Sequence, residues 1–226
     1  VTGPKDVSFP YGLVDGLGNV EVELHGQILG TGEDSAAVYL SGDGNTFTSS
    51  DTGLVQVDGE GAEIPGFGVS AFALVIAGEN STVVNAGRIE GADENPTAGI
   101  LSFGINSIEN SGTISGGRYG ILVDNALSDP GFPTLSIINS GTISGGDAAI
   151  YNISGKVHGR VKLLIQNAGT ISGSLALYSG DQLTNSGASA FVGGDGATVT
   201  VDEGGEFTNE NGAAVTGTVI VKAGAT

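Results

Sequence analysis

The residues that could do chemistry most directly lie in one short segment that alternates charged and apolar side chains. Its basic or ionisable members are Lys156, His158, Arg160 and Lys162, which we call the basic stripe. In a β-strand, alternate side chains point to opposite faces, so these four would share one face and the apolar residues the other. This pattern indicates either a dock for an anionic glycan or for an acidic surface of a neighbouring copy, or else an ordinary solvated strand face.

An acidic stripe with the same alternation stands near the start of the chain. Glu21 and Glu23 alternate with apolar residues, and His25 follows in the same phase. His25 and His158 are the two histidines of the chain and lie far apart in it. The motifs of histidine-assisted hydrolases and metalloproteases are missing from the sequence. Nucleophilic catalysis with a histidine base is therefore not predicted.

Pairs of carboxylates are the remaining candidates for catalysis. They are Glu33–Asp34, Asp58 with Glu60, Asp93–Glu94 and Asp202–Glu203. Two acids at a suitable separation can hydrolyse a glycosidic bond, so a polysaccharide lyase or hydrolase is one alternative. Each pair lies beside glycine in an expected turn, where hydration is the default, and the chain has no Trp to bind sugar. We therefore expect no catalytic residues and no enzyme activity.

The charge balance and the composition narrow the partners and cofactors. The net charge is −18, from 25 acidic and 7 basic residues, which disfavours nucleic acid and anionic lipid surfaces. The chain has no Cys, and so has neither a disulfide nor a zinc–thiolate site. Two Gly-Asp turns are similar to calcium-binding repeats, but Thr46 and Thr198 stand where a ligand carboxylate is needed. We predict no metal and no cofactor.

An internal repeat defines the elements that must hold these residues. Copies of a heptapeptide of the form Asn-[Ser/Ala]-Gly-Thr-Ile-Ser-Gly begin at Asn85, Asn110, Asn139 and Asn167, roughly 25–29 residues apart. The copy at Asn85 has Arg and Glu in place of Thr and Ser. A period of this size indicates one supersecondary unit that is copied and stacked.

Each repeat predicts three short strands joined by two bends. In the copy that contains Asn110, residues 107–110, 113–115 and 119–123 have the pattern of strands, and glycines separate them. Glycine suits both bends because it reaches positive φ without a Cβ penalty. Strands that return to their starting point after one repeat describe a coil of a parallel β-helix. The pattern predicts an all-β β-solenoid of about eight coils, with three short strands in each coil.

The domain organisation follows from the same pattern. We expect residues 1–19 to form an N-terminal cap or lead-in, and residues 20–226 to form a single β-solenoid that is most regular at 80–180. The longest apolar run, Ala71 to Ala77, is far shorter than the roughly 18–20 residues of a membrane-spanning helix. No membrane insertion is therefore expected. The insertion from Asp124 to Thr134 is either a binding loop or tolerated length variation.

Two rows of side chains are expected to run along the axis of such a stack. The first is a hydrogen-bonded ladder of amides from Asn85, Asn110, Asn139, Asn167 and Asn185. Its alternative is a surface row that binds a repetitive ligand such as a glycan. The second is an interior stack of Ile28, Ile89, Ile114, Ile143 and Ile171. Burial of one such side chain contributes roughly 1.5–3 kcal/mol.

The heptapeptide, followed by a strand of small residues such as Gly120-Ile121 or Ala149-Ile150, resembles the repeats of bacterial autotransporter passenger domains. The clear match covers about residues 80–180, and weaker copies extend across most of the chain. The resemblance implies a right-handed parallel β-helix that is secreted or displayed on a Gram-negative surface, often with an adhesive role. Proteins of this type end in a membrane-embedded β-barrel, yet Val219 to Thr226 shows no series of amphipathic strands.

We therefore predict a non-catalytic cell-surface or secreted β-helix that acts as an adhesin or a structural stalk and presents loops for binding. Because the chain begins at Val1 rather than at Met, we expect its export signal peptide to have been removed. Its expected partner is a glycan or protein of a host or neighbouring cell, or further copies of itself. A self-assembling extracellular filament subunit is the alternative, because an open solenoid exposes unpaired strand edges at its ends.

Overall fold

The fold is a stack of parallel strands on three faces. The computed structural model of the protein describes residues 8–9, 13–15, 18–31, 35–59, 68–103, 106–124, 134–153 and 161–226. These residues form strands β1 to β24 in an almost purely β architecture. Every pair of neighbouring strands among them runs parallel, with one coil of the chain lying on the next. The predicted all-β parallel β-solenoid is therefore confirmed.

Face 1 is a separate sheet of eight strands, one from each coil, so the expectation of about eight coils is confirmed. Its members are β3 (Glu21–Leu24), β6 (Thr46–Ser49), β9 (Ser81–Asn85), β12 (Asn106–Asn110), β15 (Thr134–Asn139), β17 (Lys162–Asn167), β19 (Gln182–Ser186) and β22 (Glu206–Glu210).

Faces 2 and 3 are joined into a second sheet by two long strands that turn the corner between them, β16 (Thr142–Asn152) and β18 (Thr170–Leu177). Face 2 also holds β1 (Ser8–Phe9), β4 (Gln27–Gly30), β7 (Leu54–Val57), β10 (Arg88–Gly91), β13 (Thr113–Gly116), β20 (Phe191–Gly193) and β23 (Ala214–Val215). Face 3 also holds β2 (Leu13–Asp15), β5 (Ser35–Ser41), β8 (Ala71–Ala77), β11 (Thr97–Phe103), β14 (Tyr119–Asp124), β21 (Thr198–Val201) and β24 (Thr218–Val221).

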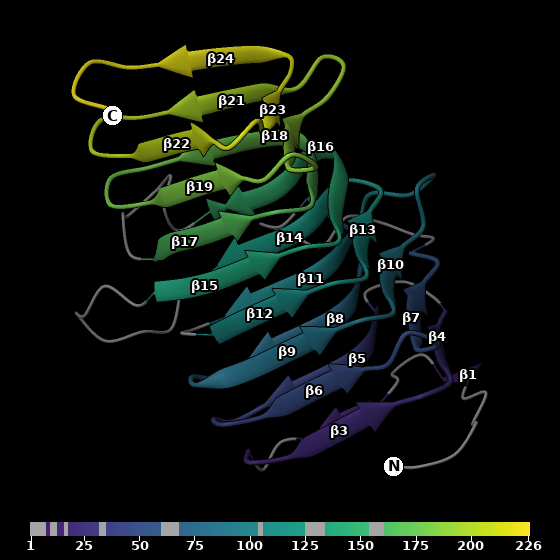
Figure 1. Ribbon diagram of the computed structural model, residues 1–226. Helices are drawn as coiled ribbons and strands as arrows, with labels where there is room; N and C mark the ends of the chain where they lie inside the picture. Colours follow the sequence, from purple (N-terminus) through teal and green to yellow (C-terminus); the bar gives the residue numbers. More distant parts are fainter. Residues whose placement is uncertain are drawn as a thin grey trace.

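Figure 1 shows how the coils wind. The strands of face 1 run from left to right at the front, and the strands of face 3 run from right to left behind them, while the chain climbs from bottom to top. This sense of winding is right-handed. Within the expected lead-in 1–19, β1 pairs with β4 and β2 pairs with β5, so both extend the same faces by one strand.

The interior is filled by like side chains stacked on like. On face 2, Ile89, Ile114, Ile143 and Ile171 are aligned by strand register, and all four are fully buried. Ile28 is partly buried at the N-terminal end of this column, and a valine of β7 separates it from Ile89. One apolar cluster of buried residues runs from Val22 on β3 to Val201 on β21, so the described coils between these strands share one core.

The glycines of the repeat serve a different purpose from the one expected. Gly87, Gly112, Gly141 and Gly169 do not have positive φ, so the expectation of a left-handed bend at these positions is wrong. A Cβ on any of them would overlap the carbonyl oxygen of the glycine one coil earlier. Glycine is required because successive coils approach so closely that no side chain fits at this corner.

Face 3 carries a second apolar layer on its outer side. Strands β8, β11 and β14 are buried on both sides, and their sequences are mainly apolar or small residues without a regular apolar–polar alternation. The outward-facing side chains form a separate cluster: Val69, Phe72, Val75, Ala98, Leu101, Tyr119, Leu122 and Ala148. The repeat pattern predicted one inward face per strand and did not reveal this layer.

Candidate functional site

The asparagines of the repeat form a continuous ladder at the corner between faces 1 and 2. Strand register places each above the next, and each side-chain Nδ2 donates to the Oδ1 of the asparagine one coil later. The four N–O distances are 2.8, 2.8, 2.7 and 2.8 Å from Asn85 to Asn185. Asn209 extends the row by one more step at 2.6 Å.

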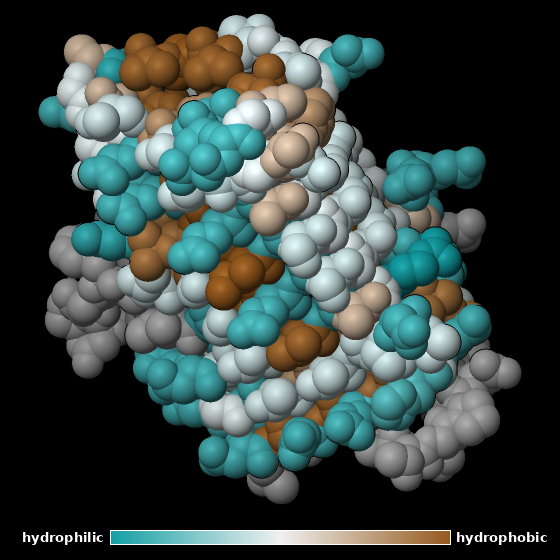
Figure 2. Space-filling view, viewed as in Figure 1, coloured by the Kyte–Doolittle hydropathy of each residue, from teal (hydrophilic) through white to brown (hydrophobic). Residues whose placement is uncertain are grey.

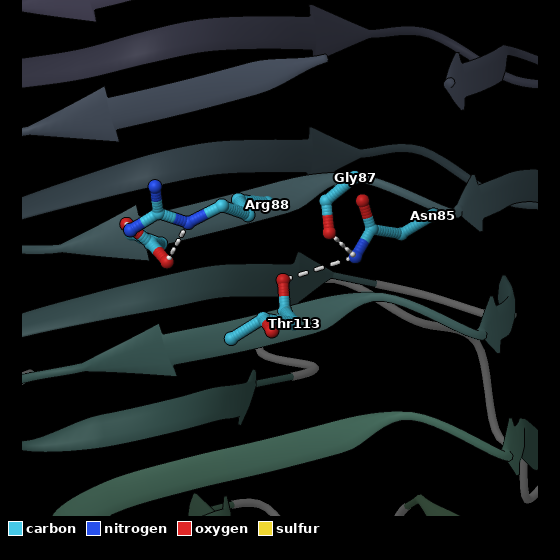
Figure 3. Close-up of polar contacts among 5 residues, drawn as sticks. Asn85, Gly87, Arg88 and Thr113 are labelled. Atoms are coloured by element: carbon cyan, nitrogen blue, oxygen red, sulfur yellow. Dashed lines mark hydrogen bonds and ion pairs between the residues drawn. The ribbon is translucent and has the colours of Figure 1, made fainter. Parts of the chain in front are cut away.

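Each amide of the ladder also ties its own turn to the next coil. In the first step, Nδ2 of Asn85 donates to the carbonyl oxygens of Gly87 and Thr113, as Figure 3 shows. The same pair of contacts recurs at every later asparagine up to Asn167. The side chains from Asn85 to Asn185 are buried and hold the stack together from inside, so they cannot contact an external glycan.

A second polar column, which the sequence analysis missed, stands where the chain enters face 1. Oδ1 of Asn45 accepts from the backbone N–H of Val20, and Oδ1 of Asn106 accepts from that of Ser81, each one coil earlier. Asp181 takes the same position in a later coil and accepts from the N–H groups of Leu163 and Tyr178 at 2.8 and 2.9 Å. These residues do not belong to the heptapeptide, and only their place at or just before the first residue of a face 1 strand could have indicated them.

Asp181 is fully buried, and its burial raises the pKa of the carboxyl group from the usual 3.8 to about 6. The two backbone N–H donors and the positive charge of Lys162 lower it, but burial is the larger effect. The ionised carboxylate thus sits in a position where two other coils use a neutral amide.

The basic stripe lies mostly outside the described residues, which include only its last member. Lys162 begins β17 and is half-buried, and its aliphatic stem lies beside Gly180 of the next coil. Its neighbours Val161 and Leu163 point into the core. The predicted alternation therefore holds at this end, whereas Lys156, His158 and Arg160 are not described.

The acidic residues that are described stand apart from one another. Glu21 and Glu23 lie on the outer side of β3, and Nε2 of His25 is 3.7 Å from Glu23. Asp93 and Glu94 are exposed in a turn, and Asp202 pairs with Lys222. Glu33, Asp34 and Glu60 fall outside the described ranges. Across the part of the chain that the structure describes, no three acidic or histidine side chains gather as a metal site.

The most distinctive surface of the described residues is a depression on the outer side of face 3, which we call the tyrosine ledge. Its aromatic members are Tyr119 on β14 and Tyr151 on β16, whose rings stack with centroids 4.9 Å apart and planes 13° apart. The remaining lining residues are Asp147, Ala148, Ile150, Ser174, Leu175, Ala176, Thr198 and Thr200. The depression has a volume of about 280 Å³.

A local change in strand register creates the ledge. Coil 5 uses the residues between Ser144 and Ala148 to turn its corner, whereas the next coil uses Gly173 alone. Gly173 has a φ of +127°, a backbone conformation that residues with a side chain rarely adopt. In the shortened coil, the small side chains of Ser174 and Ala176 line the surface next to the tyrosine rings. The depression lies where these small side chains follow the two large rings.

Two charged side chains, Arg118 and Asp147, lie beside the tyrosine pair of the ledge. Nε of Arg118 donates to Asp147 at 2.7 Å, and the guanidinium lies 5.6 Å from the centroid of the Tyr119 ring. Burial raises the pKa of Tyr119, and burial likewise raises the pKa of the nearby Tyr178 to about 12. These phenols therefore remain neutral hydrogen-bonding groups at physiological pH.

No protein-family model, no curated protein and no solved structure matches this chain. Among the described residues, no helix has the length and apolar character needed to cross a bilayer.

Proposed function

We propose that this protein is a non-catalytic, secreted or cell-surface β-helix that acts as an adhesin or structural stalk. The observation that carries the proposal is the uninterrupted asparagine ladder inside an eight-coil stack. At the usual strand spacing of about 4.8 Å, eight coils make a rod of roughly 40 Å. Such a rod holds its outer surfaces at fixed spacing, which suits presentation of binding surfaces rather than enclosure of a substrate.

The cellular location in this proposal rests on the resemblance of the heptapeptides to autotransporter passenger repeats. Export to a Gram-negative surface also agrees with a chain without Cys and with a net charge of −18, which favours solubility. The expected partner is a glycan or a protein on a host cell or neighbouring cell.

An adherence assay tests this proposal. Fluorescent beads that carry the purified chain should adhere to epithelial cells or to bacterial cells more strongly than beads that carry an unrelated acidic protein. Free chain should compete for the same sites. Equal adherence of both kinds of bead to every cell type tested would remove the adhesin proposal.

The basic stripe is a separate candidate surface within the same proposal. Changing Lys156, Arg160 and Lys162 to Glu reverses its charge, and should weaken adherence if the stripe docks an anionic glycan. The same number of lysine and arginine residues outside the stripe and the tyrosine ledge, Lys5, Arg88 and Lys222, provides a charge-matched control. Unchanged adherence of the stripe variant would leave the stripe as a solvated strand face.

A filament subunit is the second candidate, and the C-terminal coil favours it. Val219 and Val221 follow the register of the buried Val199 and Val201, yet they are 44% and 60% exposed. Figure 2 shows apolar residues gathered at this end of the molecule. This surface fits a further parallel coil, and in a filament a coil from another copy of the chain would supply it.

Negative-stain electron microscopy at high protein concentration tests this second candidate. Copies joined by their ends should give rods several times longer than one molecule, and the double variant Val219→Lys with Val221→Lys should give single short rods. Single short rods for the unmodified chain would exclude assembly through this end.

A further inference from the structure

We propose that the tyrosine ledge binds a neutral hexopyranose sugar, with one face of the sugar ring against Tyr151 and its hydroxyl groups held by the polar side chains of β18 and β21. This inference rests on the proposed adhesive function and adds to it a site and a class of ligand. Three features of the ledge carry it: its size, its aromatic wall and its polar floor.

The size of the ledge fits a single sugar unit. Its volume of about 280 Å³ is just below the range for sites of drug-sized molecules, about 300–1,000 Å³, as expected for a smaller ligand. The floor is made of small side chains from two neighbouring coils, Ser174 and Ala176 on β18 with Thr198 and Thr200 on β21. Ile150 pairs with Leu175 in the strand register, so Tyr151 and Ala176, the next residues of the two strands, lie in neighbouring coils. The side chain of Ala176 is much smaller than the ring of Tyr151, which leaves space beside the ring.

The aromatic wall supplies the apolar part of the contact. One side of a pyranose ring presents a patch of C–H groups, which stacks on the electron-rich face of an aromatic side chain. Tyr151 is held in place by stacking on Tyr119, and the guanidinium of Arg118 lies over the ring of Tyr119. The wall is therefore ordered before any ligand arrives, so little conformational freedom is lost on binding.

The floor and rim supply the polar part of the contact. Hydroxyl groups of Ser174, Thr198 and Thr200 can each donate and accept, which matches the hydroxyl groups of a sugar. Ser174 already accepts from the backbone N–H of Thr198 at 3.1 Å and still has a proton to donate. At the rim, the carboxylate of Asp147 is largely exposed and has acceptor capacity beyond its bond to Arg118.

Charge and backbone pairing exclude two other classes of ligand. A carboxylate at the rim and a net charge of −18 disfavour acidic sugars. An extended peptide would need a free strand edge, but β14, β16, β18 and β21 are paired with one another across the floor of the ledge. A neutral, hydroxyl-rich ring is the chemistry that remains.

Saturation-transfer-difference NMR on the full chain tests the site directly. The probes are methyl β-D-glucoside, methyl β-D-galactoside and methyl α-D-mannoside, with N-acetylneuraminic acid as the acidic comparison. We expect transfer to at least one neutral probe, and binding about tenfold weaker for Tyr151→Ala. Ala176→Leu should weaken binding similarly, because it fills the floor and leaves both tyrosines in place.

Tyr39→Ala is the matched control, because Tyr39 lies in the same outward-facing register column on β5, away from the ledge. Circular dichroism and thermal melting establish that each variant is folded. Absence of transfer to every neutral probe, stronger binding of the acidic sugar, or equal loss in the Tyr39 variant would each overturn the proposal. Cell adherence that survives Tyr151→Ala would show that adhesion does not use the ledge. Sugar binding by a chain that does not adhere to cells would support the sugar site and contradict the adhesin proposal.

Discussion

Replacing the buried Asp181 by Asn should change how the stability of the fold depends on pH. The pKa of Asp181 is about 6 in the folded chain, against an ordinary value of 3.8 that applies once the chain unfolds. The folded state therefore binds the proton more tightly than the unfolded state. It follows that this carboxyl group lowers the free energy of unfolding as the pH rises from about 4 to about 6, and its effect is complete above that range.

The magnitude follows from the difference between the two pKa values. Each pH unit of difference corresponds to about 1.4 kcal/mol, so ionisation of Asp181 should cost the folded state about 3 kcal/mol at pH 7. An asparagine keeps an acceptor for the N–H of Leu163, as Asn45 and Asn106 do for other coils, but it removes one acceptor from the N–H of Tyr178. That loss is the same at every pH.

Urea unfolding followed by circular dichroism at several pH values between 4 and 8 measures the effect. The free energy of unfolding of Asp181→Asn, minus that of the unmodified chain, should rise by about 2.5 kcal/mol across this range, because a small part of the effect is already present at pH 4. Asp195→Asn, at an exposed turn, is the matched control and should give a constant difference. A constant difference for Asp181→Asn as well would refute the argument from burial.

Three further changes test the packing of the coils, each by the shift in the urea midpoint. Asn139→Ala should lower the free energy of unfolding by about 2–4 kcal/mol, because it breaks the ladder and leaves Oδ1 of Asn167 unsatisfied, and a loss below 1 kcal/mol would contradict a structural role. Ser49→Asn should raise the free energy of unfolding by about 1 kcal/mol, because its amide could donate to Oδ1 of Asn85. That oxygen is buried without a partner among the described residues, and Ser49 lies opposite Asn85 in the strand register. A neutral result would show that the new amide does not fit. Gly141→Ala should lower the free energy of unfolding by about 3 kcal/mol or more, since its Cβ would overlap a carbonyl oxygen of the coil before, and tolerance of this change would contradict the close approach.

The fold could be predicted because the repeat contains its own register. Asn110, Ile114 and their equivalents recur at matching positions, so stacking like on like places every strand at once. The glycines were read correctly as corners but for the wrong reason, because steric contact between coils is not visible in one copy of the repeat.

The candidate site could not be predicted in the same way. Tyr119 and Tyr151 lie in different repeats and meet only because their strands are adjacent on face 3. The ledge also depends on the shortened corner at Gly173, where the spacing between the second and third strands departs from the repeat. Features of this kind arise where the repeat is broken, so a reading based on regularity passes over them.

The amides of the asparagine ladder all point the same way, which gives the rod a chemical polarity. Every Nδ2 is directed toward the C-terminal end, so the row begins with an acceptor, Oδ1 of Asn85, and finishes with a donor, Nδ2 of Asn209. Two C-terminal ends brought face to face would set donor against donor. The row begins only in the third coil, because Ser49 and Leu24 occupy the same register below Asn85. Its donor end alone therefore reaches an end of the described stack, and that end can add to the row only through a partner that offers an acceptor.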